Sequence, residues 1–280
     1  MDCRKTTEYL RHVGLMADED VDLAAAALAL ANLSRPDTDP GPYRVHLDAL
    51  VQDVTRAAAA TRDPLNPGLA GRIAALNAVI IDRHGYRGDR DTYDDLKNAN
   101  LMSVIDRRRG LPIAMSILFI HAARAQGWSI DGINFPGHFL LRLRHGGDAA
   151  LIDPFNEGKM RTTADLRTLI KAVRGPEAEL ARTDCQPATN RQILLRLENN
   201  IKLRLLRHER FGPAAEVVDR MLLLAPQDPE LWQEYGVLNA RIGNMRTALS
   251  ALEKSIALQP GNARQCAAQQ LLAQLRSQMN

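Results

Sequence analysis

The feature that most constrains the fold is a run of apolar residues, IAMSILFIHAA, from Ile113 to Ala123. A helix that is apolar on almost every side has to be buried by other elements. Residues 113–126 are therefore expected to form the central helix of a domain. A second helix is expected over residues 98–109, because Gly110-Leu111-Pro112 interrupts the helical pattern between the two.

The hydrophobic pattern becomes an alternating one after this helix. Residues 128–135, 138–143 and 149–155 are short segments with the alternation that is typical of strands. The sequence Arg144-His145-Gly146-Gly147-Asp148 contains the glycines that a hairpin turn requires. We expect a small antiparallel sheet that packs against the central helix.

The first ninety residues have the spacing of helices. The Ala- and Leu-rich stretch that ends near Leu33 is expected to begin at a cap formed by Asp18 or Asp20. Further helices are expected over residues 43–61 and 73–80. Aromatic residues make up only 4% of the chain, which also disfavours an all-β fold.

Two polar segments separate these helices. Pro64 and Pro67 form a break. The acidic stretch 87–95 contains Asp89-x-Asp91, but Tyr93 and Asn100 occupy positions where a calcium loop requires oxygen ligands from acidic side chains. The stretch is therefore expected to be a solvated loop.

The chain is helical again beyond Gln186 and carries a repeat. Trp232-x-x-Tyr235-Gly236-x-x-Asn239, followed by Ala248, Leu252 and Pro260, has the tetratricopeptide spacing, with Asn239 in place of the Tyr of that pattern. A degenerate copy lies one repeat earlier, and residues 262–278 would be the closing helix. The sequence thus predicts two parts: residues 1–185, which hold the helical N-terminal region and the core, and residues 186–280, which hold the helical repeats.

Charge and composition exclude several classes of protein. The chain has 36 basic and 33 acidic residues, a balance that is not typical of nucleic-acid binders. Arg107-Arg108-Arg109 is short enough to be a solvated helix end. No segment has the roughly 18 apolar residues of a membrane span, and the cysteines, Cys3, Cys185 and Cys266, form no disulfide framework. We expect a cytoplasmic protein that binds neither nucleic acid nor membranes.

A histidine and an aspartate are placed where they can meet across the predicted hairpin. His138 opens one strand and Asp153 closes the next. A carboxylate beside an imidazole fixes the tautomer of the ring and raises its basicity, which is the arrangement of base and orienting residue in a nucleophilic triad. The alternative is that His138 only satisfies a turn with its two nitrogens.

Several motifs surround this pair in a fixed order: Asn98 with Leu101, Val104 to Gly110, Leu111-Pro112, Arg124 to Gly127, Pro136 to Arg142, and Asp153-Pro154-Phe155. With this order and spacing the chain resembles the transglutaminase core. More narrowly, it resembles the SirB-type bacterial proteins, in which such a core precedes tetratricopeptide repeats. The resemblance covers roughly residues 40–265. It implies an α+β, mainly helical fold, with a transglutaminase/papain-like core and a helical extension.

The resemblance also implies where a catalytic cysteine would lie. Relatives of this fold use a Cys-His-Asp triad whose Cys stands at the N-terminus of the central helix, where the helix dipole stabilises a thiolate. Counting back from Arg124-Ala125-Gln126-Gly127 puts that position on Pro112, which has no nucleophile. His138 and Asp153 would then be a residual dyad.

Other nucleophiles are poorly placed. Ser116 and Ser103 lie inside the expected helices, where a serine hydroxyl usually bonds to a carbonyl of the preceding turn. The cysteines lie outside the motifs, and Cys185 is the nearest to the core in sequence. Asn98 is assigned to the same cleft from the resemblance, with Ser116 as a second candidate; the alternative for Asn98 is a helix N-cap.

No cofactor or metal is expected, because His121, His138 and His145 lack a second ligand at a recognisable spacing. Three functions remain. The first is a non-catalytic module for protein interaction or regulation. The second is a hydrolase or acyltransferase that uses His138 and Asp153 with an unusual nucleophile or an activated water. The third is a pocket that binds a peptide or ligand without turnover. For the first, the candidate repeat residues for packing or partner binding are Trp232, Tyr235 and Asn239.

Overall fold

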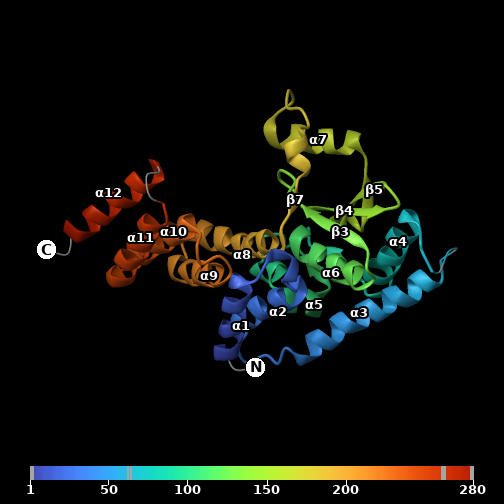
Figure 1. Cartoon of the computed structure of the whole chain (residues 1–280), viewed down its shortest axis with the longest axis horizontal. Coiled ribbons are helices and arrows are strands. Elements are labelled where there is room, and N and C mark those ends of the chain that lie inside the picture. The colour runs from blue at the N-terminus through green and yellow to red at the C-terminus, as the bar shows by residue number, and fades with distance from the viewer. Residues whose placement is uncertain (1–2, 62, 64, 260–262, 278–280) are drawn as a thin grey trace. The chain divides into compact units, whose positions relative to one another are not determined.

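The computed structural model describes residues 3–61, 63, 65–259 and 263–277. The chain divides into two compact units, one of residues up to Thr6 with Asp18–Leu194, and one of Thr7–Ala17 with the residues from Leu195 onward (Figure 1). Pro64, Pro260, Asn262 and Gln278, which enter the sequence predictions, lie outside the described residues.

The first unit is mainly helical around one sheet. Its α-helices are α2 (Leu23–Leu33), α3 (Gly41–Ala59), α4 (Leu69–Leu76), α5 (Leu101–Arg107), α6 (Pro112–Ala125) and α7 (Thr163–Arg174). A π-helical segment, η2 (Asn77–Arg83), continues α4, and short 3-10 segments are η1 (Asp18–Asp20), η3 (Leu96–Ala99), η4 (Pro154–Asn156) and η5 (Arg182–Cys185). Helices α1 (Cys3–Leu15) and α8 (Asn190–Arg207) each contribute residues to both units.

Five antiparallel strands form the sheet. They are β3 (Ser129–Ile133), β4 (Leu140–His145), β5 (Asp148–Asp153), β6 (Lys159–Arg161) and β7 (Pro187–Ala188), in the order β6-β5-β4-β3-β7. The predicted turn joins β4 to β5 at Gly146 and Gly147, both with positive φ, a conformation that glycine adopts without steric cost. The expected small antiparallel sheet is confirmed, and it is extended by two edge strands that the alternation did not indicate.

Helix α6 is the buried helix that its composition requires. Every residue from Pro112 to Ile120 is buried, and the helix packs against β3 and β4. A two-residue parallel ladder precedes it, in which β1 (Arg87–Gly88) pairs with β2 (Arg109–Gly110). Strand β1 forms the first two residues of the acidic stretch 87–95, which was expected to be a loop. Its pairing with β2 holds the beginning of this stretch next to the beginning of α6.

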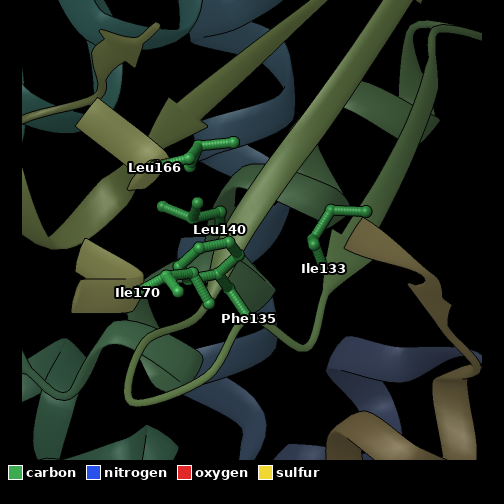
Figure 2. Packing of buried hydrophobic residues seen from close by; sticks show 5 residues of the cluster. All are labelled: Ile133, Phe135, Leu140, Leu166 and Ile170. Carbon is green, nitrogen blue, oxygen red and sulfur yellow. The ribbon is translucent and has the colours of Figure 1, made fainter. Parts of the chain in front are cut away.

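A second helix covers the other side of the sheet. Leu166 and Ile170 of α7 pack with Ile133, Phe135 and Leu140, and all five side chains are buried (Figure 2). Leu140 and Leu141 point to opposite faces because side chains alternate along a strand. The sheet is therefore a middle layer between α6 and α7 (Figure 1).

The second unit is helical. It contains α9 (Phe211–Leu224), α10 (Pro229–Arg241), α11 (Met245–Leu258) and α12 (Ala263–Ser277), together with the C-terminal part of α8 and the part of α1 from Thr7 onward. Ala214 and Ala248, the small residues of the two repeat copies, are both fully buried. A Cβ on Gly236 would lie 2.8 Å from Cγ of Leu252, so α10 and α11 approach each other too closely for a larger residue. The α+β fold with a helical extension is confirmed.

Two helix caps differ from the prediction. Asp22, not Asp18 or Asp20, caps α2, because its carboxylate accepts the backbone N–H of Ala25 at 3.0 Å. Asn100, not Asn98, caps α5 by accepting the N–H of Ser103 at 3.0 Å. In both cases the segment is rich in capping residues, and the sequence alone does not show which one precedes the first helical turn.

Candidate functional site

The structure brings His138 and Asp153 together at one end of the β4–β5 hairpin. Leu141 pairs with Ile152, so Asp153 lies opposite Leu140 and close to the residues that enter β4. Nε2 of His138 is 2.9 Å from Oδ2 of Asp153. The Asp153 side chain is fully buried and that of His138 is 15% exposed. This places a buried carboxylate behind a partly accessible imidazole.

Asp153 has further partners besides His138. Arg161, from the edge strand β6, donates Nε at 3.0 Å and Nη2 at 2.7 Å to the same Oδ2. Asn156 donates its Nδ2 to Oδ2 at 2.6 Å and its backbone N–H to Oδ1 at 3.2 Å. Burial raises the pKa of Asp153, but the hydrogen bonds and charges of His138, Asn156 and Arg161 outweigh it and hold the pKa at about 2. Asp153 is therefore a carboxylate throughout the ordinary pH range.

Phe155 packs beside the histidine. The ring of His138 meets it edge to face with centroids 6.4 Å apart, and Tyr93 does the same at 5.9 Å. The guanidinium of Arg90 lies over the Phe155 ring, 5.8 Å from its centroid. A Cβ on Gly88 would come within 2.5 Å of Phe155, so only glycine allows β1 to pass this close. The segment that follows β1 thus borders the dyad.

A buried aspartate holds this bordering segment in place. Asp89 is fully buried; its carboxylate accepts the backbone N–H of Thr92 at 2.9 Å and the guanidinium of Arg107 at 2.9 Å. Burial raises the pKa of Asp89, while the bonds from Thr92, Asn98 and Arg107 lower it more, to about 2. The acidic stretch is an anchored turn beside the site.

The start of α6 carries no nucleophile. Pro112 is the first residue of the helix, and Leu111 before it makes no side-chain cap. Ser116, one turn later, is fully buried and donates its hydroxyl to the carbonyl of Pro112 at 2.8 Å. Ser103 is buried in α5. Cys185 is a free, partly buried thiol in η5; the side chains of Cys3 and Cys266 lie outside the described ones.

Asn98, the other polar residue assigned to the cleft, is also enclosed. Asn98 is fully buried in η3; its amide donates to the carbonyl of Thr92 at 2.6 Å and accepts from Arg107 at 3.0 Å. Asn98 and Ser116 therefore present no polar atom to an incoming ligand. Phe155, which belongs to the Asp153-Pro154-Phe155 motif, borders the dyad. Arg161 and Asn156 also border it and were not identified from the sequence.

The candidate repeat residues lie together on α10. Trp232 donates its Nε1 to the carbonyl of Pro226 at 2.9 Å, and its ring meets that of Tyr235 edge to face at 6.3 Å. Asn239 is buried and donates to the carbonyl of Tyr235 at 2.8 Å. Trp232 and Tyr235 are partly exposed. Each of the three side chains has a packing or hydrogen-bonding role within the unit.

Two further features are absent from the part of the chain that the structure describes. No group of three or more His, Cys, Asp or Glu side chains there is arranged to hold a metal ion. Among the same residues, no helix is long and apolar enough to cross a membrane.

Comparison with known proteins agrees with this architecture. Residues 42–199 match the model of the transglutaminase-like superfamily, and residues 201–280 match a tetratricopeptide repeat model. The chain is 33% identical to a UPF0162 protein of Xylella fastidiosa over 246 residues, which is 87% of this chain and 86% of that protein. It is 29% identical to a UPF0162 protein of Vibrio cholerae, over 84% of this chain and 86% of that one.

A third relative matches a shorter part of the chain. F-box only protein 21 of Mus musculus is 36% identical over 104 residues, which is 34% of this chain and 17% of that protein. The family model spans the buried helix α6, the sheet and both members of the dyad. The chain belongs to the transglutaminase-like superfamily, and its core is followed by tetratricopeptide repeats.

Proposed function

We propose that this protein is a non-catalytic member of the superfamily, of the SirB type, which acts in the bacterial cytoplasm through protein interaction or regulation. The observation that carries the proposal is Pro112 at the first position of α6. That position would hold the catalytic Cys of a triad, and proline has no group that can attack a substrate. No described serine replaces it, because Ser116 is buried and bonded to its own helix.

The surroundings of Asp153 support the same proposal. In a triad the aspartate orients the histidine and stabilises the imidazolium that forms during reaction. Here the same carboxylate oxygen also accepts two hydrogen bonds from Arg161. The positive charge of Arg161 offsets the negative charge of Asp153 that would otherwise stabilise the imidazolium of His138. The dyad is thus better suited to hold the hairpin, β6 and η4 together than to activate a nucleophile.

The tetratricopeptide region supports the interaction part of the proposal. Repeats of this kind present extended surfaces to other proteins, and the partner proposed here is a protein or peptide rather than a nucleic acid or membrane. Trp232 is both a packing residue and partly exposed, so it can contribute to folding and to binding. Comparing Trp232→Ala with Trp232→Phe separates these roles, because the phenylalanine keeps an aromatic surface while losing the bond to Pro226.

A second candidate function is hydrolysis by a water activated at the dyad. The 2.9 Å contact between His138 and Asp153 favours it, since that pairing is the one a general base requires. The interaction proposal and this one differ in whether any chemistry depends on His138.

Chemical probes detect a side-chain nucleophile that depends on His138. An activated water leaves no label and is detected instead by hydrolysis of p-nitrophenyl acetate, whose rate we expect to be equal in wild type and His138→Ala. The full chain is treated with a fluorophosphonate and with an iodoacetamide probe, and labelling is compared in wild type, His138→Ala and His208→Ala, the last being an exposed histidine of the second unit. We expect no labelling that depends on His138. Labelling that is lost in His138→Ala and kept in His208→Ala would overturn the non-catalytic proposal.

Restoring the nucleophile tests the position itself. Pro112→Cys places a thiol at a helix N-terminus, where thiolates are stabilised. We expect this variant to gain iodoacetamide labelling at residue 112, and His138→Ala in the same background to slow that labelling on the order of tenfold. Equal labelling rates with and without His138 would show that residue 112 is not the vacant nucleophile position.

A further inference from the structure

A cavity in the first unit lies outside the dyad and its bordering segment. It has a volume of about 410 Å³ and is lined by Arg142, Leu180, Ala181, Arg182, Cys185, Gln186 and Pro187. The volume falls within the range of small-molecule sites, roughly 300–1,000 Å³. Strand β4 supplies Arg142, and the segment from α7 to β7 supplies the other residues.

The charges that line this cavity are of one sign. The described lining residues include two guanidinium groups, on Arg142 and Arg182, and no carboxylate. Leu180, Pro187 and the Cys185 thiol add apolar surface. Burial raises the pKa of Cys185, and the negative charge of Asp184 raises it further, whereas the charge of Arg142 lowers it. The thiol therefore stays neutral and does not offset the positive charge of the two arginines.

Arg142 is incompletely satisfied by the protein. Its Nη1 donates to the carbonyl of Cys185 at 3.3 Å, and its Nη2 reaches Oδ2 of Asp131 only at 3.4 Å. That same Asp131 oxygen is held at 2.6 Å by Arg144. The Nε of Arg142 is buried and has no hydrogen-bond partner among the described residues. Both Nη atoms of Arg142 are thus held only by long contacts.

The chemistry of the lining indicates which ligand the cavity fits. The Nε–Nη2 edge of Arg142 faces the carboxylate of Asp131, so Arg142 contributes positive charge together with the guanidinium of Arg182. Guanidinium groups bind carboxylates through charge-assisted hydrogen bonds. We infer that this cavity binds a small organic carboxylate, with its charge on Arg142 and Arg182 and its apolar part against Leu180 and Pro187.

Cys185 provides a built-in reporter for the test. In a chain with Cys3→Ser and Cys266→Ser, Cys185 is the only thiol. Its alkylation rate is measured with iodoacetate, which is a small carboxylate, and with iodoacetamide, its neutral counterpart. We expect the iodoacetate-to-iodoacetamide ratio in the folded chain to be on the order of tenfold above the ratio in the same chain unfolded in urea, and to fall as salt is added.

Variants and competitors complete the experiment. Arg142→Gln and Arg182→Gln are expected to reduce the ratio severalfold, whereas Arg167→Gln, an exposed arginine of α7 outside the lining, leaves it unchanged. Because Arg182 is exposed, its variant remains informative if Arg142→Gln does not fold. We also expect 4-methylpentanoate to slow alkylation more than either 4-methylpentanamide or inorganic phosphate.

Three results would overturn the inference. They are a ratio equal to that of the unfolded chain, a ratio that both arginine variants leave unchanged, and protection by the amide or by phosphate that equals protection by 4-methylpentanoate. None of these results depends on whether the dyad is catalytic, so the carboxylate site and the proposed function are tested separately.

Discussion

The side chain of Asp18 caps a helix that begins 172 residues later in the sequence. Its two carboxylate oxygens accept the backbone N–H groups of Asn190 at 2.7 Å and Arg191 at 2.8 Å, at the first turn of α8. The amide of Asn190 in turn donates to the carbonyl of Asp18 at 2.8 Å. The start of α8 is thereby joined to the segment that precedes α2.

Removing this cap should destabilise the first unit. For Asp18→Ala we expect a loss of about 1–2 kcal/mol in the free energy of unfolding, because two helix N–H groups lose their acceptor and the anion near the helix N-terminus is removed. Urea denaturation followed by circular dichroism measures the change. Asp20→Ala, an exposed aspartate of the same 3-10 turn, is the control and should change stability by less than about 0.5 kcal/mol. Equal effects of the two variants would contradict the capping role.

Asp153 should make the stability of the first unit depend on acidic pH. Its pKa is depressed from an unfolded value near 4 to about 2. A depressed carboxyl pKa contributes stability that is fully present above the unfolded pKa and is lost as the pH falls through the folded one. We expect a contribution on the order of 2 kcal/mol that disappears between pH 4 and pH 2.

The variant Asp153→Asn isolates this contribution. It should lower the melting temperature at pH 7 and flatten the dependence of stability on pH between 4 and 2, because no group then titrates at this position. Asp148→Asn, an exposed aspartate at the start of β5, is the matched control. Thermal melts across this range provide the comparison, and an unchanged pH profile in Asp153→Asn would show that the dependence arises elsewhere.

Gly88 should not tolerate a side chain. Its added Cβ would lie 2.5 Å from both Cδ2 and the carbonyl oxygen of Phe155, so Gly88→Ala has to displace either β1 or the residue beside the dyad. We expect a loss of about 1–3 kcal/mol, the usual cost of overpacking. Gly71→Ala lies inside α4, and its new Cβ would make only ordinary contacts of 3.4 Å or more, so it should be neutral or slightly stabilising in the same denaturation experiment. A neutral Gly88→Ala would mean that β1 does not pass this close to Phe155.

Trp232 should stabilise the repeat unit through both its ring and its N–H group. Trp232→Phe removes the hydrogen bond to Pro226 and should cost about 1 kcal/mol. Trp232→Ala also removes the ring contact with Tyr235 and should cost at least twice as much. The loss is measured by thermal denaturation, next to affinity capture of partners from a native lysate with each variant. If Trp232→Ala leaves both unfolding and partner binding unchanged, the proposed role of this repeat is wrong.

The sequence predicted the elements that are marked by local signals. The apolar run of α6, the Gly146-Gly147 turn and the small alanines of the repeats depend on residues close in sequence, and all three predictions are confirmed. The strands β6 and β7 were not predicted, because three and two residues are too few to show alternation. Helix α7 carries a capping box at Thr162 and Asp165, a signal that could have identified it.

The candidate site was predicted only in part. Asp153 closes β5 as predicted, whereas His138 does not open a strand: it lies in the turn before β4, which begins at Leu140. The strand pattern predicted that the two residues are near each other, and the turn that carries His138 was not predicted. Arg161 completes the environment of Asp153 from a strand whose pairing cannot be deduced from its own three residues. Asn98 was predicted to be either a cleft residue or a helix N-cap. Its burial and its hydrogen bond from Arg107 depend on tertiary packing that no local sequence pattern encodes.

The pairing of β7 with β3 affects folding during synthesis and the choice of where an isolated core should end. Gly132 and Ile133 of β3 pair with Pro187 and Ala188, which leave the ribosome more than fifty residues later. Until then, β3 is an open edge that neighbouring chains can pair with. A fragment that ends at Cys185 would keep that edge permanently and would lose the helix start that Asp18 caps. An isolated core that remains soluble should therefore extend at least through the first turn of α8.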